Sequence, residues 1–276
     1  MFRKKFLAPL NRHKIRPISA TLPDLETWFE SPLGQQLLNE EKKTLDQVLN
    51  CMFGYHLMQL SVSAKSCLYE GSRVSHCFSM KASTNTENAK AAAFAEYDNL
   101  PLEDESIDVT ILHHVLEFSS NPHQVLKEAS RVTIPRGYII ILGFNPFSSM
   151  GLIKPFAQAV SSKAIWQRHS LRRSRISDWL QFLDCNTIGS ESAHFNLPVQ
   201  NNKLLAYGDR MNGWLRRSGL PFGNVYCLIA RKDRASIRPI RPSWSKYTGF
   251  RSAKPAISAR SAARLALVKN NKQQGQ

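Results

Sequence analysis

The chain has 276 residues, of which 42% are hydrophobic, so it can bury a sizeable core within one large domain. It carries 37 Lys and Arg against 21 Asp and Glu, a formal net charge of +16, and the excess lies in two acid-free ends, residues 1–16 and 235–276. The longest apolar runs are too short for a membrane span, and the five scattered cysteines form no C-x-x-C pair. These features argue against membrane proteins and disulfide scaffolds and favour a reducing, cytoplasmic location.

Charge and composition divide the chain into a basic N-terminal arm (1–20), a domain (21–234) and a C-terminal tail (235–276). The arm has one short apolar run, broken by Pro9, which is too short for the core of a signal peptide. An organellar presequence remains the alternative for this arm. The tail is rich in Arg, Lys, Ser, Ala and Pro, and this composition predicts that it lacks a fixed structure.

The first predicted helix extends from Ser31 to Gly54. Ser31 suits the N-cap, Pro32 suits the first helical position, and Gly54 can adopt the left-handed conformation that ends a helix. Between them, leucines at helical spacing form an apolar stripe, which predicts that this helix packs on another layer.

Two nearly all-apolar runs, Asp108–Leu112 and Tyr138–Gly143, bracket a segment whose apolar residues recur at helical spacing. Such runs are typical of strands buried on both faces, and the spacing between them predicts a crossover helix. A right-handed crossover places the carboxyl ends of both strands at one edge, where open α/β sheets bind ligands. The site is therefore expected near Leu112–Phe118 and Gly143–Pro146.

The crossover helix has predicted boundaries of its own. Asn121 is expected to cap its first turn, Pro122 suits the first position, and Gln124 completes a capping box. Pro135 and Gly137 are expected to end the helix before the next strand.

The remaining buried runs complete a Rossmann-like α/β fold, a seven-stranded, mostly parallel sheet with helices on both faces. Only a short connection follows Ser61, so the helix between the first two strands is expected to be short or malformed. Another helix is predicted at Arg175–Cys185. The predicted strands lie near 56–60, 73–79, 92–96, 108–113, 138–143, 188–194 and 224–231.

The block from Glu96 to Gly151 resembles the second half of a class I S-adenosylmethionine-dependent methyltransferase, in the group called methyltransferase type 11. The matching positions are Leu100, Pro101, Ile107, Asp108, Arg131, Val132, Pro135 and Gly137. The resemblance implies the class I methyltransferase fold, whose last strand inserts antiparallel. It also implies methyl transfer from S-adenosylmethionine to an acceptor that the sequence does not identify.

In that group the cofactor lies over the carboxyl ends of the first and fourth strands. The resemblance thus implies the cofactor-binding residues Gln59, Ser61, Ser63, Glu96, Tyr97 and His113. Several positions depart from the group's pattern. Gln59 stands where the group has an acid, Ser61 and Ser63 occupy glycine positions, and the second strand ends in Met80 and Lys81 rather than in a carboxylate.

Helices ahead of the first strand often cover the cofactor pocket in this group, so Trp28 and Phe29 either close the pocket or serve as core anchors. His113 and His114 are neighbours on a strand and are expected to point to opposite faces, so no metal site is predicted. The histidine that faces the cleft is a structural residue or a general base, and Glu117 is the alternative base. The catalytic residues remain unassigned.

Three hypotheses follow. The chain is a methyltransferase, or a methyltransferase-fold protein that has lost cofactor binding and serves as a binding or scaffold protein, or a nucleic-acid binder whose domain presents basic arms. Basic residues interleaved with Trp244, Tyr247 and Phe250 in the tail suit contacts with RNA phosphates and bases. A solubilising tail with nonspecific affinity for polyanions is the alternative.

Overall fold

The structure is a computed structural model that describes residues 18–63, 67–82, 93–161, 163–193 and 223–233. All of these residues belong to one unit, which spans Met1–Ser236. Of the predicted basic arm only residues 18–20 are described, and they begin the first helix. The predicted C-terminal tail lies outside the described residues.

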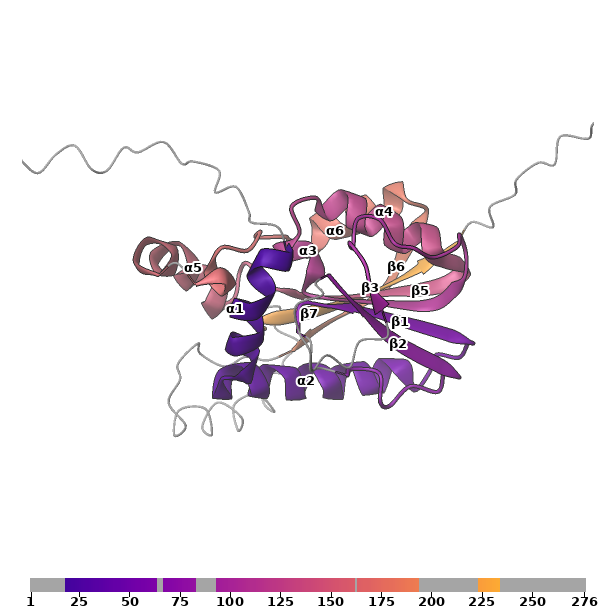
Figure 1. The fold of residues 1–276 in the computed structure, drawn as a ribbon, viewed down its shortest axis with the longest axis horizontal. Helices are drawn as coiled ribbons and strands as arrows, with labels where there is room; N and C mark the ends of the chain where they lie inside the picture. The colour runs from indigo at the N-terminus through magenta and orange to yellow at the C-terminus, as the bar shows by residue number, and fades with distance from the viewer. Residues whose placement is uncertain (1–17, 64–66, 83–92, 162, 194–222, 234–276) are drawn as a thin grey trace, which may run out of the picture. The chain divides into compact units, whose positions relative to one another are not determined.

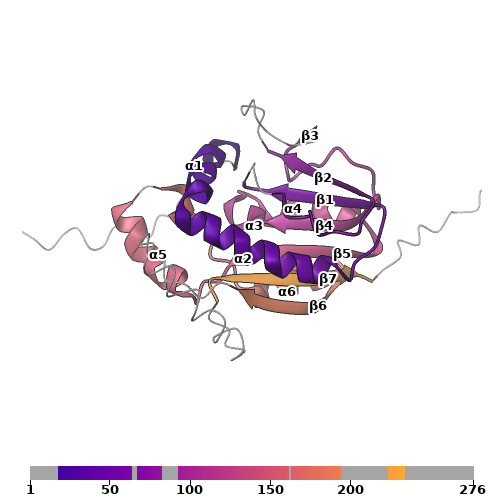
Figure 2. The same ribbon diagram turned by 90° about the horizontal axis from the view of Figure 1, so that it is seen from below.

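Seven strands form one sheet in the order β3-β2-β1-β4-β5-β7-β6 (Figures 1 and 2). The strands β1 to β5 pair in parallel, and β7 lies antiparallel between β5 and β6, as the resemblance implied. The predicted Rossmann-like sheet is therefore confirmed. The strands are β1 (His56–Ser61), β2 (His76–Lys81), β3 (Ala93–Phe94), β4 (Ile107–His113), β5 (Thr133–Phe144), β6 (Cys185–Ala193) and β7 (Val225–Lys232).

Helices cover both faces of this sheet, as predicted (Figure 1). On one face, α2 (Pro32–Leu49) packs Leu45 and Leu49 into an apolar cluster with side chains of β1, β4 and β5. On the other face, α4 (Pro122–Val132) and α6 (Arg173–Phe182) share a second cluster with the same central strands. The central strands are buried on both sides because each face has a helical cover.

A helix that the sequence analysis did not predict, α1 (Ile18–Glu30), lies at the carboxyl edge of the sheet. Its Leu25 and Phe29 share an apolar cluster with Val62, which follows β1, and Phe144, which ends β5. The one-turn helix α3 (Val115–Phe118), α5 (Ser149–Val160) and the 3-10 turn η1 (Ala164–Trp166) adjoin the same edge. The edge where a ligand was expected is thus partly covered.

The start of α2 agrees with the prediction and its end does not. The Ser31 hydroxyl accepts a hydrogen bond from the backbone N–H of Gly34 at 3.3 Å, and Pro32 is the first helical residue. The helix ends at Leu49, so Gly54 does not end it. A Cβ atom on Gly54 would lie 2.5 Å from the Cβ atom of Asp108, so a glycine is required for close approach to β4.

The predicted capping box of α4 is wrong. The Asn121 side chain makes no capping hydrogen bond, and the Gln124 side chain instead donates to the backbone carbonyl of Asp98 at 3.3 Å. The predicted end is also displaced, because α4 passes directly into β5 at Thr133. Pro135 lies inside that strand, where the chain turns locally through Arg136 with a φ of 66°.

The connection between β1 and β2 is short, as predicted. Its described residues, 62–63 and 67–75, contain no helix. Leu68 from this connection joins the cluster that α2 forms beneath the sheet. Helix α2, which precedes β1 in the chain, therefore covers the face on which a β1–β2 crossover helix would pack.

Candidate functional site

The centre of the carboxyl edge is formed by β1 and β4, where Ser61 pairs with His113 in the parallel ladder. In the sheet, β2 lies on the outer side of β1, and β5 lies on the opposite side, beyond β4. Such a reversal of strand order is the topological switch point at which open α/β sheets bind ligands. The sequence analysis placed the candidate site here.

The polar side chains at the end of β1 are engaged in holding the turn. The buried Gln59 side chain accepts a hydrogen bond from the backbone N–H of Leu68 at 3.0 Å. The Ser61 hydroxyl lies 2.7 Å from Nδ1 of His113 and accepts from the backbone N–H of Ser63 at 3.0 Å. These residues thus connect the end of β1 to its own loop and to β4.

Tyr97 contacts the ends of both β1 and β2. Its hydroxyl lies 2.8 Å from the carbonyl oxygen of Ser61 and 3.2 Å from that of Met80. Burial raises the pKa of Tyr97 well above its ordinary value, so the phenol stays a hydrogen-bond donor. The neighbouring Glu96 is exposed. Of the predicted cofactor residues, Ser61, Ser63, Tyr97 and His113 form one contiguous group, Gln59 lies beneath it, and Glu96 lies on the surface.

The end of β2 confirms the departure seen in the sequence. Lys81 is the last residue of this strand, and it is buried. A basic side chain therefore occupies the strand end at which the resembling group has the acid for the ribose hydroxyls.

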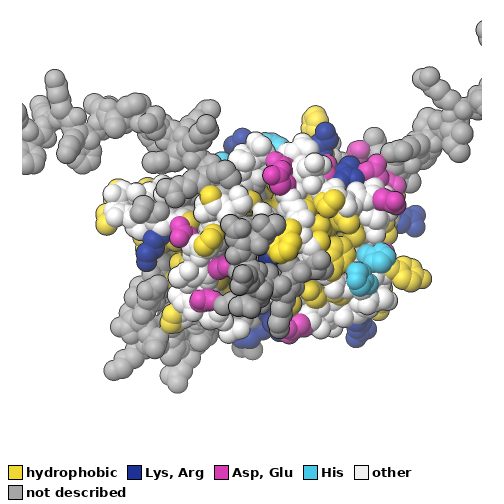
Figure 3. All heavy atoms as spheres, viewed as in Figure 1, with side chains coloured by type: hydrophobic (Ala, Val, Ile, Leu, Met, Phe, Trp, Pro, Cys, Tyr) yellow, Lys and Arg dark blue, Asp and Glu magenta, His cyan; other side chains and the backbone are white. Residues whose placement is uncertain are grey.

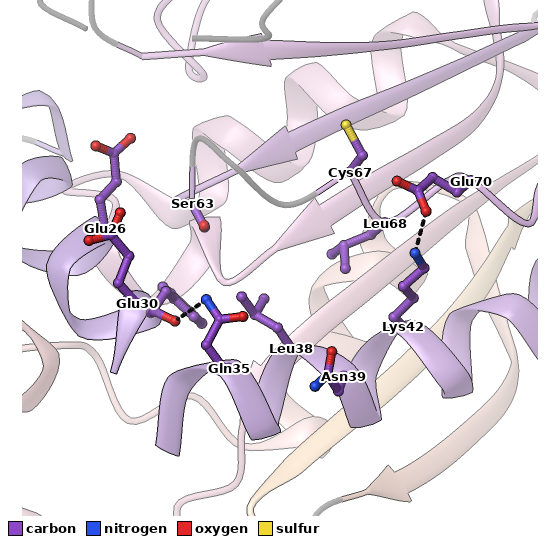
Figure 4. Close-up of a pocket in the computed structure, with 11 residues that line it drawn as sticks. Glu26, Glu30, Gln35, Leu38, Asn39, Lys42, Ser63, Cys67, Leu68 and Glu70 are labelled. Atoms are coloured by element: carbon purple, nitrogen blue, oxygen red, sulfur yellow. Dashed lines mark hydrogen bonds and ion pairs between the residues drawn. The ribbon is translucent and has the colours of Figure 1, made fainter. Parts of the chain in front are cut away.

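A cavity of about 300 Å³ opens beside the turn after β1 (Figure 4). Its walls come from α1, α2 and the β1–β2 connection, and Gln35 joins the two helices by donating to the carbonyl of Phe29 at 3.0 Å. Acidic side chains are spread over the face of the molecule that Figure 3 shows. The lining residues are Glu26, Phe29, Glu30, Gln35, Leu38, Asn39, Lys42, Ser63, Cys67, Leu68 and Glu70.

A buried charged cluster, here called the Glu41 cluster, lies at the same edge and consists of Glu41, His113, His114 and Glu117. The Glu41 carboxylate bonds Nε2 of His113 at 3.0 Å through one oxygen and Nε2 of His114 at 2.7 Å through the other. Nδ1 of His114 lies 3.0 Å from the Glu117 carboxylate. All four residues are almost fully buried.

The prediction that His113 and His114 point to opposite faces is wrong. Their ring centroids lie 4.7 Å apart, and both rings contact the same carboxylate. The cause is local, because β4 ends at His113 and His114 adopts a left-handed conformation with a φ of 56°. The alternation of side chains along a strand does not continue through such a residue.

Charge pairing sets the protonation of the cluster. Burial alone would lower the pKa of His114, but the carboxylates of Glu41 and Glu117 raise it to about 9. Burial alone would raise the pKa of Glu41, but the two imidazoles lower it to about 2. Burial lowers the pKa of His113. At neutral pH the cluster therefore contains an ionised Glu41 paired with a protonated His114.

Glu117, the alternative general base, is also engaged in structural hydrogen bonds. One of its oxygens contacts His114, and the other accepts a hydrogen bond from the backbone N–H of Phe144 at 2.5 Å.

The sequence analysis missed Glu41 altogether. The available signal was its place on the apolar stripe of α2, midway between Leu37 and Leu45.

Comparisons with known proteins bear on the family and the fold of the chain. The model of the protein family described as "Methyltransferase domain" matches residues 51–141. A relative from Escherichia coli (strain K12), designated uncharacterized protein YafS, is 27% identical over 233 residues, covering 83% of this chain and 90% of the relative.

Two solved structures show the fold. One is a Thermotoga maritima S-adenosylmethionine-dependent methyltransferase, described as a possible histamine N-methyltransferase, with a TM-score of 0.53, 15% identity, and coverage of 78% of this chain and 98% of that chain. The other is the [4+2]-cyclase SpnF, with a TM-score of 0.50, 12% identity, and coverage of 70% and 80% respectively.

Proposed function

We propose that this chain is a class I methyltransferase that binds S-adenosylmethionine beside the turn after β1 and transfers its methyl group to an acceptor, which the match to the methyltransferase domain model and the shared fold support. The observation that supports this most directly is the cavity between α1, α2 and that turn, which lies next to the topological switch point. The acceptor is left open.

The cavity suits a ligand that carries positive charge. S-adenosylmethionine has a sulfonium and an ammonium group, and the carboxylates of Glu26, Glu30 and Glu70 line the cavity with Lys42 as the one cation among the lining residues. Lys42 is itself paired with Glu70. The lining therefore fits the cationic portion of the cofactor, although the strand ends carry Gln59 and Lys81 in place of acids.

When bound, S-adenosylmethionine supplies an electrophilic methyl group. The chain's own contribution is to bind and orient it, with Ser63 and Leu68 on the strand side and the carboxylates of α1 opposite (Figure 4). The packing of α1 over the carboxyl edge limits the access of water to this side of the cavity. Proton removal from an acceptor is not assigned to any residue, because the nearby His113 and Glu117 are buried in other contacts.

Calorimetric titration of the full chain with S-adenosylmethionine and S-adenosylhomocysteine tests the proposal. We expect saturable binding that is weakened about tenfold or more by Asn39→Trp, because an indole at this position of α2 would occupy the cavity. Lys43→Trp is the matched control, since Lys43 lies on the same helix with a side chain that is 64% exposed and outside the cavity.

A bulky residue at Ser61 is a poor test of cofactor binding. The Ser61 hydroxyl already bonds His113 and Ser63 in a buried position, so such a variant would disturb the fold. Failure of both ligands to bind the wild-type chain would reject cofactor binding outright.

A second candidate function is that of a binding or scaffold protein without the cofactor. It is favoured by the contacts that already engage polar groups at the end of β1: Gln59 accepts from the N–H of Leu68, and the carbonyl of Ser61 accepts from the hydroxyl of Tyr97. Absence of binding of either ligand, seen by calorimetry at two temperatures and in a protein with an intact fold, would favour this candidate over the first.

RNA is a proposed partner of the basic ends, and a cytoplasmic location is proposed with it. The five cysteines are free, which agrees with a reducing compartment. Among the described residues no helix is both long and apolar enough to cross a membrane.

Deleting 235–276 is expected to weaken RNA binding by about tenfold or more, because nine Lys and Arg and no acids are removed. The affinity of the full chain should fall steeply with salt concentration in filter-binding or anisotropy assays, whereas affinity for S-adenosylmethionine should be unchanged by the deletion. Equal RNA affinity in the truncated chain, or binding independent of salt, would remove RNA from the proposal.

A further inference from the structure

We propose that Glu41, His113 and His114 form a binding site for one divalent transition metal ion, with zinc as the reference ion. This inference does not depend on the proposed methyltransferase activity. It concerns the interior of the Glu41 cluster, which is separate from the lining of the cavity beside the β1 turn.

The ligand atoms already converge. One ligand atom from each of Glu41, His113 and His114 lies within 4.8 Å of the other two. Each Nε2 atom lies 2.7–3.0 Å from a Glu41 oxygen. Ligand atoms about 2.0–2.2 Å from one tetrahedral ion lie about 3.3–3.6 Å apart. Binding of the ion therefore widens each contact between Nε2 and Glu41 by about 0.3–0.9 Å and displaces the proton held in that contact.

The outer nitrogens of both rings are held as in protein metal sites. Nδ1 of His114 lies 3.0 Å from the Glu117 carboxylate, and Nδ1 of His113 lies 2.7 Å from the Ser61 hydroxyl. Metal-binding histidines commonly hold the outer ring nitrogen in this way, because the contact fixes the ring orientation and directs Nε2 at the ion.

The convergence of the two rings requires an unusual backbone conformation at His114. His114 has a φ of 56°, a left-handed conformation that is uncommon for a residue with a side chain. An extended residue at this position would turn its ring to the opposite face of the sheet. Strained residues of this kind cluster at functional sites, where surrounding contacts enforce them.

Charge and surroundings favour a transition metal over magnesium or calcium. Two carboxylates, Glu41 and Glu117, contribute negative charge at the site, with the buried Arg168 as the cation near Glu117, and two imidazole nitrogens suit zinc, cobalt or nickel. The rings of Phe29 and Phe144 pack against His114, with centroids 5.9 and 4.2 Å away. Magnesium retains water and calcium prefers oxygen ligands, so neither suits this apolar enclosure.

Cobalt absorption tests the proposal on the full chain after treatment with a chelator. The exposed pair His56 and His76, whose Nδ1 atoms lie 3.3 Å apart, could bind cobalt at the surface, so the experiment uses an H56N/H76N background. We expect one equivalent of Co²⁺ to give visible d–d absorption. Addition of Zn²⁺ should displace the Co²⁺ and abolish this absorption. Zn²⁺ should also raise the Tm in a concentration-dependent manner.

In that background, His114→Asn is expected to weaken Co²⁺ binding about 100-fold or more, because it removes a ligand. Asparagine tolerates left-handed conformations better than most residues, which preserves the backbone. Glu117→Gln is expected to weaken binding about tenfold, because it alters the orientation of His114 without removing a ligand. The proposal is overturned if the background protein shows neither absorption nor a Tm shift, or if His114→Asn leaves the affinity unchanged.

Discussion

Replacing Glu41 by alanine is expected to lower the free energy of unfolding by about 3–5 kcal/mol, the usual cost of removing one partner of a buried ion pair. Glu41 is fully buried and is the only described group that bonds Nε2 of both His113 and His114. Alanine would leave the His113 N–H without that acceptor and the His114 cation with Glu117 alone. Urea unfolding in the presence of a chelator measures the loss without a contribution from bound metal.

The matched control is Glu40→Ala on the same helix. Glu40 pairs with the exposed Lys43 at 2.7 Å, and a surface pair of this kind contributes at most about 1 kcal/mol. Glu41→Gln should lie between the two, because the amide keeps one acceptor but carries no charge. Similar losses for Glu40→Ala and Glu41→Ala would mean that the Glu41 cluster does not stabilise the fold.

The sheet could be predicted because its signals are local and consistent. Asp108–Leu112 and Tyr138–Gly143 are nearly all apolar, and such runs beside a helical segment are typical of strands buried on both faces. The structure places both within adjacent parallel strands, β4 and β5.

Helix caps were less predictable than strands. Asn121 has a suitable side chain for capping but makes no capping hydrogen bond, and the Gln124 side chain bonds the carbonyl of Asp98 in a neighbouring loop.

The Glu41 cluster could not be predicted because it depends on two features that lie far from each other in the sequence. Glu41 comes from α2, and its partners come 72 and 73 residues later at the end of β4. The convergence of the two rings further requires the left-handed backbone of His114, for which the residue type gives little warning. Periodicity describes the regular part of a strand and does not extend past its end.

The role of Trp28 and Phe29 was left between a cover for the pocket and a core anchor. Phe29 is 1% exposed and belongs to the apolar cluster at the carboxyl edge, so it is a core anchor. It also lines the cavity, so the two roles coincide in one side chain. Helix α1 thus covers the site by the same contacts that attach it to the sheet.

Phe29→Ala is accordingly expected to lower the free energy of unfolding by about 3–5 kcal/mol, whereas Phe29→Leu should cost less than about 1.5 kcal/mol. The ring packs against His113, His114 and Trp28, with centroid distances of 5.5, 5.9 and 4.9 Å. Truncation removes these contacts and joins the cavity to the Glu41 cluster, so water gains access to the imidazoles.

Denaturant unfolding measures the stability loss, and the exchange of imidazole N–H protons in NMR spectra measures the access of water. Exchange should be faster in Phe29→Ala than in wild type or Phe29→Leu, because leucine still fills most of the space between α1 and the histidines. Phe182→Ala is the surface control, since that ring is 92% exposed and its loss should change stability by less than about 0.5 kcal/mol. Slow imidazole exchange in Phe29→Ala would show that α1 does not control the access of water to the cluster.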